Sequence, residues 1–204
     1  LPIWPVFAGK AEAGATVVLY DTDGASELGR GLAASDGTWS ITSQSLAAGD
    51  HQLTARQTDA AGNAGAASAA LKVTIDTTTA PPPPAPDLAA ASDSGASDSD
   101  NLTRITTPTL SGAAEADAAV TLLDTDGATV LGVGVASTLG AWSITSKALA
   151  DGDHALTVKQ TDLAGNVSAA SAALKVTIDT TPPPAPPAPD LDRKSTRLNS
   201  SHRT

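Results

Sequence analysis

The chain has 204 residues, and its 22 acidic against 12 basic residues give a formal net charge of −10. This acidity argues against nucleic acid or an anionic membrane as a partner, and the length fits two domains of about 100 residues. There is no Cys and no Met, which excludes a disulfide framework and indicates an internal fragment. The fragment contains no predicted membrane span, and this says nothing about the parent protein.

Short antiparallel strands are predicted along the first half of the chain. In residues 71–76, Leu71, Val73 and Ile75 alternate with polar side chains, the period of two that is typical of a half-buried strand. Residues 39–42 and 53–56 alternate in the same way. Turn signals separate these runs, and they lie at Asp23-Gly24, Asp36-Gly37, Gly62-Asn63, Asp126-Gly127 and Gly165-Asn166.

A complete unit of this pattern occurs twice. The motif Trp-Ser-Ile-Thr-Ser at 39–43 returns at 142–146, an offset of 103 residues. Asp-Thr-Asp-Gly at 21–24 returns at 124–127 with the same offset. A period this long indicates a whole domain copied in tandem, which favours reach, valency or mechanical length over a single catalytic pocket.

The second copy contains seven predicted strands. They cover residues 86–91, 107–112, 118–124, 129–136, 140–146, 153–161 and 171–178. Seven short strands in about 100 residues predict an all-β fold, a tandem of immunoglobulin-like (fibronectin III-like) seven-stranded β-sandwiches. We expect a first module at 1–79 that lacks its first strand, for which residues 1–4 are a poor substitute, and a complete module at 80–181.

A proline run joins the two modules. Residues 77–86 contain four consecutive prolines, which favour a semi-rigid polyproline II spacer. Residues 182–191 repeat this linker and the start of a third module. The register fails at Asp192, and we interpret 192–204 as a translated sequencing adapter; a genuine basic tail is the alternative. Without that segment the formal charge is 8 − 21 = −13.

Several short motifs in the second copy resemble one family. They include Asp-Ser-Gly at 93–95, Asp-Asn-Leu-Thr at 100–103, Gly-Ala-Trp-Ser-Ile at 140–144 and Thr-Asp-Leu-Ala-Gly-Asn at 161–166. Residues 5–191 resemble the bacterial Ig-like repeats of large surface adhesins, biofilm-associated proteins and repeats-in-toxin adhesins. The resemblance implies an extracellular or cell-surface stalk, with calcium often bound between modules. Its partners would be neighbouring modules of the same chain and, through regions outside this fragment, a host or biofilm surface.

Strand parity predicts which acidic loops face each other across the junction. Counting through antiparallel strands brings together Asp21, Asp23, Asp50 and Asp76 of the first module with Glu115, Asp117 and Asp162 of the second. Calcium prefers six to eight oxygen ligands, so it is the natural neutraliser of such a cluster. We therefore expect a calcium ion to stiffen the joint, and like charges to loosen it when calcium is absent.

Simpler interpretations stay open for several of these residues. Asp-x-Asp-Gly is a good hairpin turn by itself, which applies to Asp21, Asp23 and their copies Asp124 and Asp126. The acidic loop at 93–101 either wraps a second ion or is a solvated loop. His51 and His154 each lie beside an Asp and are expected to be capped histidines at strand edges.

The sequence therefore favours a non-enzymatic stalk segment that extends an adhesive region for cell adhesion or biofilm formation. No motif places a nucleophile beside a base, so no catalytic residues are predicted. Two alternatives remain. One is a module that binds carbohydrate or protein, and the other is a spacer appended to a secreted hydrolase.

Overall fold

The computed structural model describes residues 4–189. Three interpretations of the sequence fall outside this range. They are the adapter origin of 192–204, the start of a third module at 190–191, and the contribution of residues 1–3 to the first module.

The first module is a sandwich of two antiparallel sheets. Its six strands are β1 (Val6–Lys10), β2 (Thr16–Tyr20), β3 (Glu27–Leu32), β4 (Thr38–Thr42), β5 (Gly49–Thr58) and β6 (Leu71–Ile75). One sheet pairs β1 with β4, and the other has the order β3-β2-β5-β6. Alternation along these strands turns every second side chain inward, and the buried cluster consists of Val17, Leu19, Leu28, Ile41, Leu46, Leu53 and Ile75.

The second module repeats this plan and adds an N-terminal part. Its elements are β7 (Asp87–Leu88), the 3-10 turn η1 (Ala90–Ser92), β8 (Leu102–Thr103), β9 (Thr109–Ala113), β10 (Ala119–Leu123), β11 (Val130–Val135), β12 (Ala141–Thr145), β13 (Gly152–Thr161) and β14 (Leu174–Ile178). The sheets have the orders β12-β9-β7 and β11-β10-β13-β14-β8. The chain is thus all-β, with two immunoglobulin-like sandwiches in tandem, as the sequence predicts.

Each predicted strand of the second module is present, and the differences lie at its start. The first predicted strand shrinks to β7, because η1 turns the chain at Ala90–Ser92. β8 is an unpredicted strand that pairs in parallel with β14. Two residues are too few for a recognisable alternation. The N-terminal segment therefore contributes to both sheets in turn.

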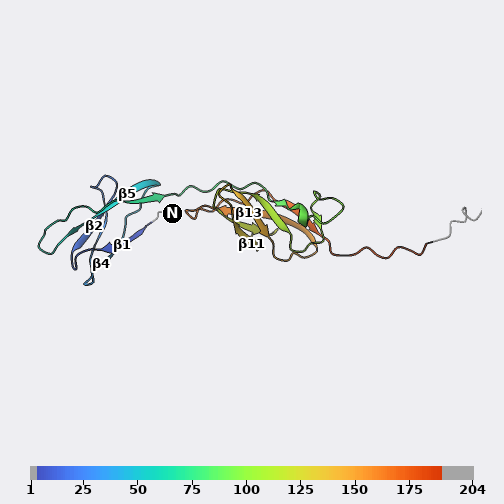
Figure 1. The fold of residues 1–204 in the computed structure, drawn as a ribbon, viewed down its shortest axis with the longest axis horizontal. Helices are drawn as coiled ribbons and strands as arrows, with labels where there is room; N and C mark the ends of the chain where they lie inside the picture. The colour runs from blue at the N-terminus through green and yellow to red at the C-terminus, as the bar shows by residue number, and fades with distance from the viewer. Residues whose placement is uncertain (1–3, 190–204) are drawn as a thin grey trace, which may run out of the picture.

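The proline-rich segment is docked along the second module and is not a free spacer. Ala80, Pro83 and Pro86 are buried, and this interval of three matches the three residues per turn of polyproline II. Leu88 then enters the core of the second module by pairing with Leu110 of β9. Figure 1 shows the segment running along the side of the second module.

The two modules lie end to end along the long axis of the molecule (Figure 1). β6 leads out of the first module, and the first proline of the connecting segment, Pro81, lies six positions after its last residue, Ile75. Within residues 4–189 the one helical segment is η1, so no helix there could span a membrane.

Candidate site at the junction between the modules

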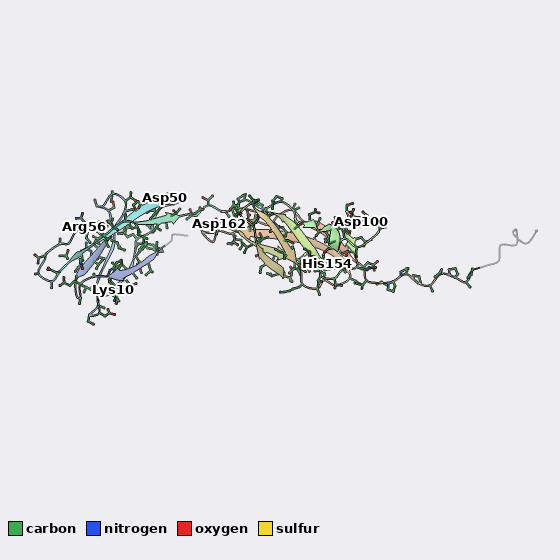
Figure 2. All side chains as sticks on the ribbon, in the orientation of Figure 1. Lys10, Asp50, Arg56, Asp100, His154 and Asp162 are labelled. Atoms are coloured by element: carbon green, nitrogen blue, oxygen red, sulfur yellow. The ribbon has the colours of Figure 1, made fainter. Side chains whose placement is uncertain are left out.

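A hollow of about 420 Å³ lies between the modules, and three of the predicted carboxylates line it. Asp76 comes from the first module, directly after β6. Glu115 and Asp162 come from the second module, after β9 and after β13. Alternate strands of an antiparallel sandwich end at the same pole, which explains why these loops meet. Figure 2 shows Asp162 at the end of the second module that faces the first.

The Asp162 carboxylate organises its own loop. It accepts hydrogen bonds from the Asn166 backbone at 2.8 Å, from the Asn166 side chain at 2.9 Å and from the Ala164 backbone at 2.9 Å. The bonds from Asn166 lower the pKa of Asp162, because they stabilise the charged form. The Asp162 carboxylate is therefore ionised at neutral pH, but its hydrogen-bonding capacity is already used within its own loop.

The carboxylates of Asp76 and Glu115 accept fewer hydrogen bonds than that of Asp162. One Asp76 carboxylate oxygen accepts a hydrogen bond from the Thr78 backbone at 2.8 Å. Within the described residues, no hydrogen bond or ion pair involves the Glu115 carboxylate, although the Glu115 backbone N–H donates to Gln160 Oε1 at 2.7 Å. These two side chains can bind a further partner at the hollow without losing a structural role.

Two side chains of the second module hold the connecting backbone. Asn166 donates from Nδ2 to the Asp76 carbonyl oxygen at 3.1 Å, and Gln160 donates from Nε2 to the Pro81 carbonyl oxygen at 2.7 Å. Gln160 is only 2% exposed, and its Oε1 also accepts the Glu115 backbone N–H, so both ends of its amide are held. The joint is thus clamped on both sides of residues 77–80.

Sequence reasoning missed both of these joint residues, although each had a signal. Gln160 is a polar residue on the inward face of an alternating strand, and a buried amide needs a hydrogen-bond partner. Asn166 belongs to the turn motif at 162–166, which explains its contact with Asp162 but not its second contact across the joint.

Asp21 lies near the same pole but not at the hollow. Its carboxylate contacts Nδ1 of His51 at 2.8 Å, while His51 Nε2 lies 3.0 Å from the Ala47 carbonyl oxygen. Burial raises the pKa of Asp21, but the hydrogen bonds from His51 and Thr22 outweigh burial and lower it overall. Both ring nitrogens of His51 face acceptors, and the hydrogen bond to Asp21 raises its pKa.

The second module contains the same pair. His154 Nδ1 lies 2.9 Å from Asp124 Oδ1, and Nε2 lies 3.0 Å from the Ala150 carbonyl oxygen. Burial lowers the pKa of His154, but the bonds to Asp124 and Ala150 raise it overall. The histidines therefore tie the loop after β2 to the start of β5, and the loop after β10 to the start of β13.

The remaining predicted residues have local roles and do not line the hollow. Asp23 accepts from Ser26 and Ala25 within its turn, and the Ser26 bonds lower its pKa to about 2. Asp50 pairs with Lys72 at 2.8 Å and accepts from Thr74. Asp117 has a left-handed φ of 59°, a conformation that Asp tolerates at turns.

The hollow has the right kind of donors for calcium, but it is not a closed coordination cage. Carboxylate and hydroxyl oxygens line it, which are the hard ligands that calcium prefers. Among residues 4–189, no three acidic, histidine or cysteine side chains lie close enough together to hold a metal ion. The residues fit the ion by chemistry, and a site would form only if Asp76 and Glu115 drew together.

The acidic loop at 93–101 is built around one buried carboxylate. Asp93 is 6% exposed and accepts from the Asn101 backbone at 3.1 Å through Oδ2. Asp93 Oδ1 has no hydrogen-bond partner in the described part of the chain. Asp98 and Asp100 are exposed, so most of this loop is solvated.

The family follows from the sequence itself. A model described as bacterial Ig-like domain matches residues 3–77 and 79–180. The chain therefore belongs to the bacterial Ig-like domain family. A search of curated proteins found no match.

Solved structures with similar folds are distant. A biofilm associated protein BSP domain is 17% identical, with 87% of this chain and 28% of that chain covered and a TM-score of 0.34. A Ca2+-stabilized adhesin of an Antarctic bacterium is 19% identical, with 85% and 43% covered and a TM-score of 0.40. The fibronectin(III)-like modules of Clostridium thermocellum CbhA are 16% identical, with 85% of each chain covered and a TM-score of 0.43. This chain spans less than half of the first two proteins.

Proposed function

We propose that the chain is a non-catalytic stalk segment of a bacterial cell-surface or secreted adhesin. Its modules extend an adhesive region, located elsewhere in the parent protein, for cell adhesion or biofilm formation. The observation that carries this proposal is the clamped end-to-end joint, in which Gln160 and Asn166 hold the connecting backbone. A stalk needs reach and resistance to bending, and such a joint supplies both.

A binding screen separates a stalk from a recognition module. The chain is presented to immobilised glycans, extracellular matrix proteins and bacterial or host cells. A stalk segment binds none of them above background. Saturable binding to one class of glycan or protein would contradict the proposal and favour a recognition module. The DNA on both sides of the coding segment then distinguishes an adhesin from a secreted hydrolase.

The proposal includes calcium at the hollow. Asp76 and Glu115 would supply carboxylate ligands from opposite modules, and Asp162 would keep its loop in place beside them. The ion would neutralise charges that otherwise repel across the joint, and water would complete its shell of six to eight oxygens. Calcium would thereby add stiffness to a joint already held by amide hydrogen bonds.

Thermal unfolding tests calcium binding. Calcium at about 100 times its dissociation constant would stabilise the chain by about 2.7 kcal/mol, because it binds the folded state alone. Replacing both ligands, Asp76→Asn with Glu115→Gln, should abolish the rise in Tm. Asp179→Asn is the matched control, because Asp179 repeats Asp76 at the far end of the second module and likewise accepts from the backbone two residues on. A Tm that calcium leaves unchanged would refute the calcium part and leave the stalk proposal standing.

A further inference from the structure

The loop between η1 and β8 closes around a buried carboxylate. Asp93 follows η1 directly and is 6% exposed. Its Oδ2 accepts a hydrogen bond at 3.1 Å from the backbone N–H of Asn101, at the opposite end of the loop. The carboxylate therefore lies between the two arms of the loop. Its Oδ1 is shielded from solvent and has no hydrogen-bond partner among residues 4–189.

The negative charge of Asp93 is not balanced by the residues around it. Within the described part of the chain, no Lys, Arg or His side chain forms an ion pair with Asp93. A buried carboxylate costs free energy unless a cation or several hydrogen bonds compensate it. A proton on Oδ1 would remove the charge but create a buried hydroxyl donor that also lacks a partner. A cation bound at Oδ1 would supply both the missing charge and the missing contact.

The other oxygens of the loop are of the kind that calcium binds. Residues 93–101 read Asp-Ser-Gly-Ala-Ser-Asp-Ser-Asp-Asn, so they offer carboxylate, hydroxyl and amide oxygens and contain no His or Cys. Gly95 lets backbone oxygens come close: the carbonyl oxygens of Leu102 and Ser97 lie 3.5 and 3.7 Å from the position that a Cβ on Gly95 would occupy. Calcium accepts six to eight such oxygens in irregular geometry, whereas magnesium requires a near-ideal octahedron and keeps several waters. The donor set therefore favours calcium.

The base of the loop is fixed, and its tip is free to adjust. At the base, Ser94 Oγ and Thr103 Oγ1 lie 2.9 Å apart, and the Arg104 backbone donates to Ser94 Oγ at 3.0 Å. On the other arm, the Thr177 backbone of β14 donates to the Asn101 carbonyl oxygen at 2.9 Å. Residues 98–100 at the tip are exposed, so their oxygens can move toward an ion while the buried carboxylate stays in place.

We propose that the loop at 93–101 binds a calcium ion, with Oδ1 of Asp93 as the anchoring ligand. Among residues 4–189 no three acidic, histidine or cysteine side chains converge, so backbone carbonyl oxygens, a carboxylate of the exposed tip and water complete the shell. The bound ion ties the η1 end of the loop to the β8 end. Since β7 belongs to one sheet and β8 to the other, the ion fixes the point at which the chain crosses between the sheets.

This site is separate from the hollow at the joint. Figure 2 shows Asp100 at the end of the second module away from the first, and Asp162 at the end that faces it. The proposed ligands all belong to one loop of the second module, so the ion needs no residue from a neighbouring module. The proposal is therefore independent of the stalk function and of calcium at the joint.

Calcium titration followed by ¹H–¹⁵N NMR of the full chain tests the proposal. The starting protein carries Asp76→Asn with Glu115→Gln, which removes the two carboxylate ligands proposed at the joint. Calcium chloride should shift the amide signals of residues 93–103 saturably, with a dissociation constant of about 10⁻⁴–10⁻³ M, the range of extracellular modules. Adding Asp93→Asn should weaken binding by about tenfold or more, because the affinity of a calcium site depends on the charge of its ligands. The new amide oxygen can still accept the N–H of Asn101.

Asp126→Asn in the same starting protein is the matched control. Asp126 accepts from the Ala128 and Thr129 backbones within its own turn, and β13 and β14 separate the preceding strand β10 from β8 in the sheet. This variant should bind calcium as the starting protein does. If calcium leaves the signals of residues 93–103 unchanged in the starting protein, the proposal is overturned, whether or not the Asp93→Asn variant folds. Shifts that persist in the Asp93→Asn variant at the same calcium concentrations would overturn it as well.

Discussion

At the scale of single residues, Trp39 and Trp142 each pack on a glycine of the neighbouring strand. Trp142 is 4% exposed and pairs in register with Gly112. A methyl group added at Gly112 would lie 2.7 Å from Trp142 Cζ2, much closer than van der Waals contact. Gly9 and Trp39 repeat the arrangement at 2.6 Å. The missing side chain makes room for the indole ring.

Gly112→Ala should therefore destabilise the second module by about 1–3 kcal/mol, the usual cost of overpacking a core. Urea unfolding followed by tryptophan fluorescence measures this change. Gly95→Ala is the control, because its added methyl group would meet its nearest neighbour at 3.5 Å, an ordinary contact. Equal stability of the two variants would show that the ring has room to move.

The histidine–aspartate pairs predict how stability depends on pH. His51 has a pKa raised above its usual 6.5, so the folded state binds its proton more tightly than the unfolded state. The stabilisation is fully present below pH 6.5 and is lost as the pH rises through the raised pKa. Asp21 has a lowered pKa, so its contribution is present above pH 3.8 and is lost as the pH falls.

Chemical unfolding at pH 6 and pH 9 measures the histidine part. The free energy of unfolding should be lower at pH 9, and the double variant His51→Gln with His154→Gln should lose most of this difference. His202→Gln, which removes the third histidine of the chain, is the control. An unchanged pH dependence in the double variant would contradict the assigned role of the pairs.

At the scale of elements, the proline segment behaves as part of the second module. Leu88 is 5% exposed in the core, so Leu88→Ala should lower the stability of that module by about 2–5 kcal/mol. Pro84 is exposed on the same segment, and Pro84→Ala should have little effect. Calorimetry of both variants provides the measurement. A negligible effect of Leu88→Ala would mean that the segment is a free linker after all.

Strand alternation predicted most of these elements correctly. Leu71, Val73 and Ile75 needed only their period of two to be assigned to a strand, and each Asp-Gly pair marked a turn. The docking of the proline run was not predictable in this way. A proline run has the same composition whether it is free or docked, and only burial at every third residue tells the two apart. β8 was missed because its two residues form no pattern.

The sequence predicted the positions of the candidate site's carboxylates better than it predicted their hydrogen bonds and ion pairs. Strand parity predicted that Asp76 of the first module faces Glu115 and Asp162 of the second, and in the structure all three line one hollow. Strand parity could not show that Asp50 forms an ion pair with Lys72 or that the Asp21 carboxylate is hydrogen-bonded to His51. Those contacts depend on cross-strand register and on side-chain reach, which the spacing of acidic residues does not contain.

At the scale of the whole molecule, the proposed stalk function depends on how the two sandwiches are held relative to each other. Both sandwiches match the same family model. The joint holds them end to end, which makes the molecule long. Asn166 bonds across that joint to the Asp76 carbonyl oxygen, and Gln160 holds the connecting segment at Pro81, where it reaches the second module. Their copies Gln57 and Asn63 bond to the Glu12 backbone and to Asp59 inside the first module, and among residues 4–189 neither makes a hydrogen bond to the second module.

Small-angle X-ray scattering of the full chain tests this claim most directly. The wild type should scatter as one elongated particle with a narrow range of angles between modules. The double variant Gln160→Ala with Asn166→Ala should show a broader, shorter distribution, while Gln57→Ala with Asn63→Ala should scatter like the wild type. A wild type that already requires a broad distribution of angles would contradict the stiff joint on which the proposed stalk function depends.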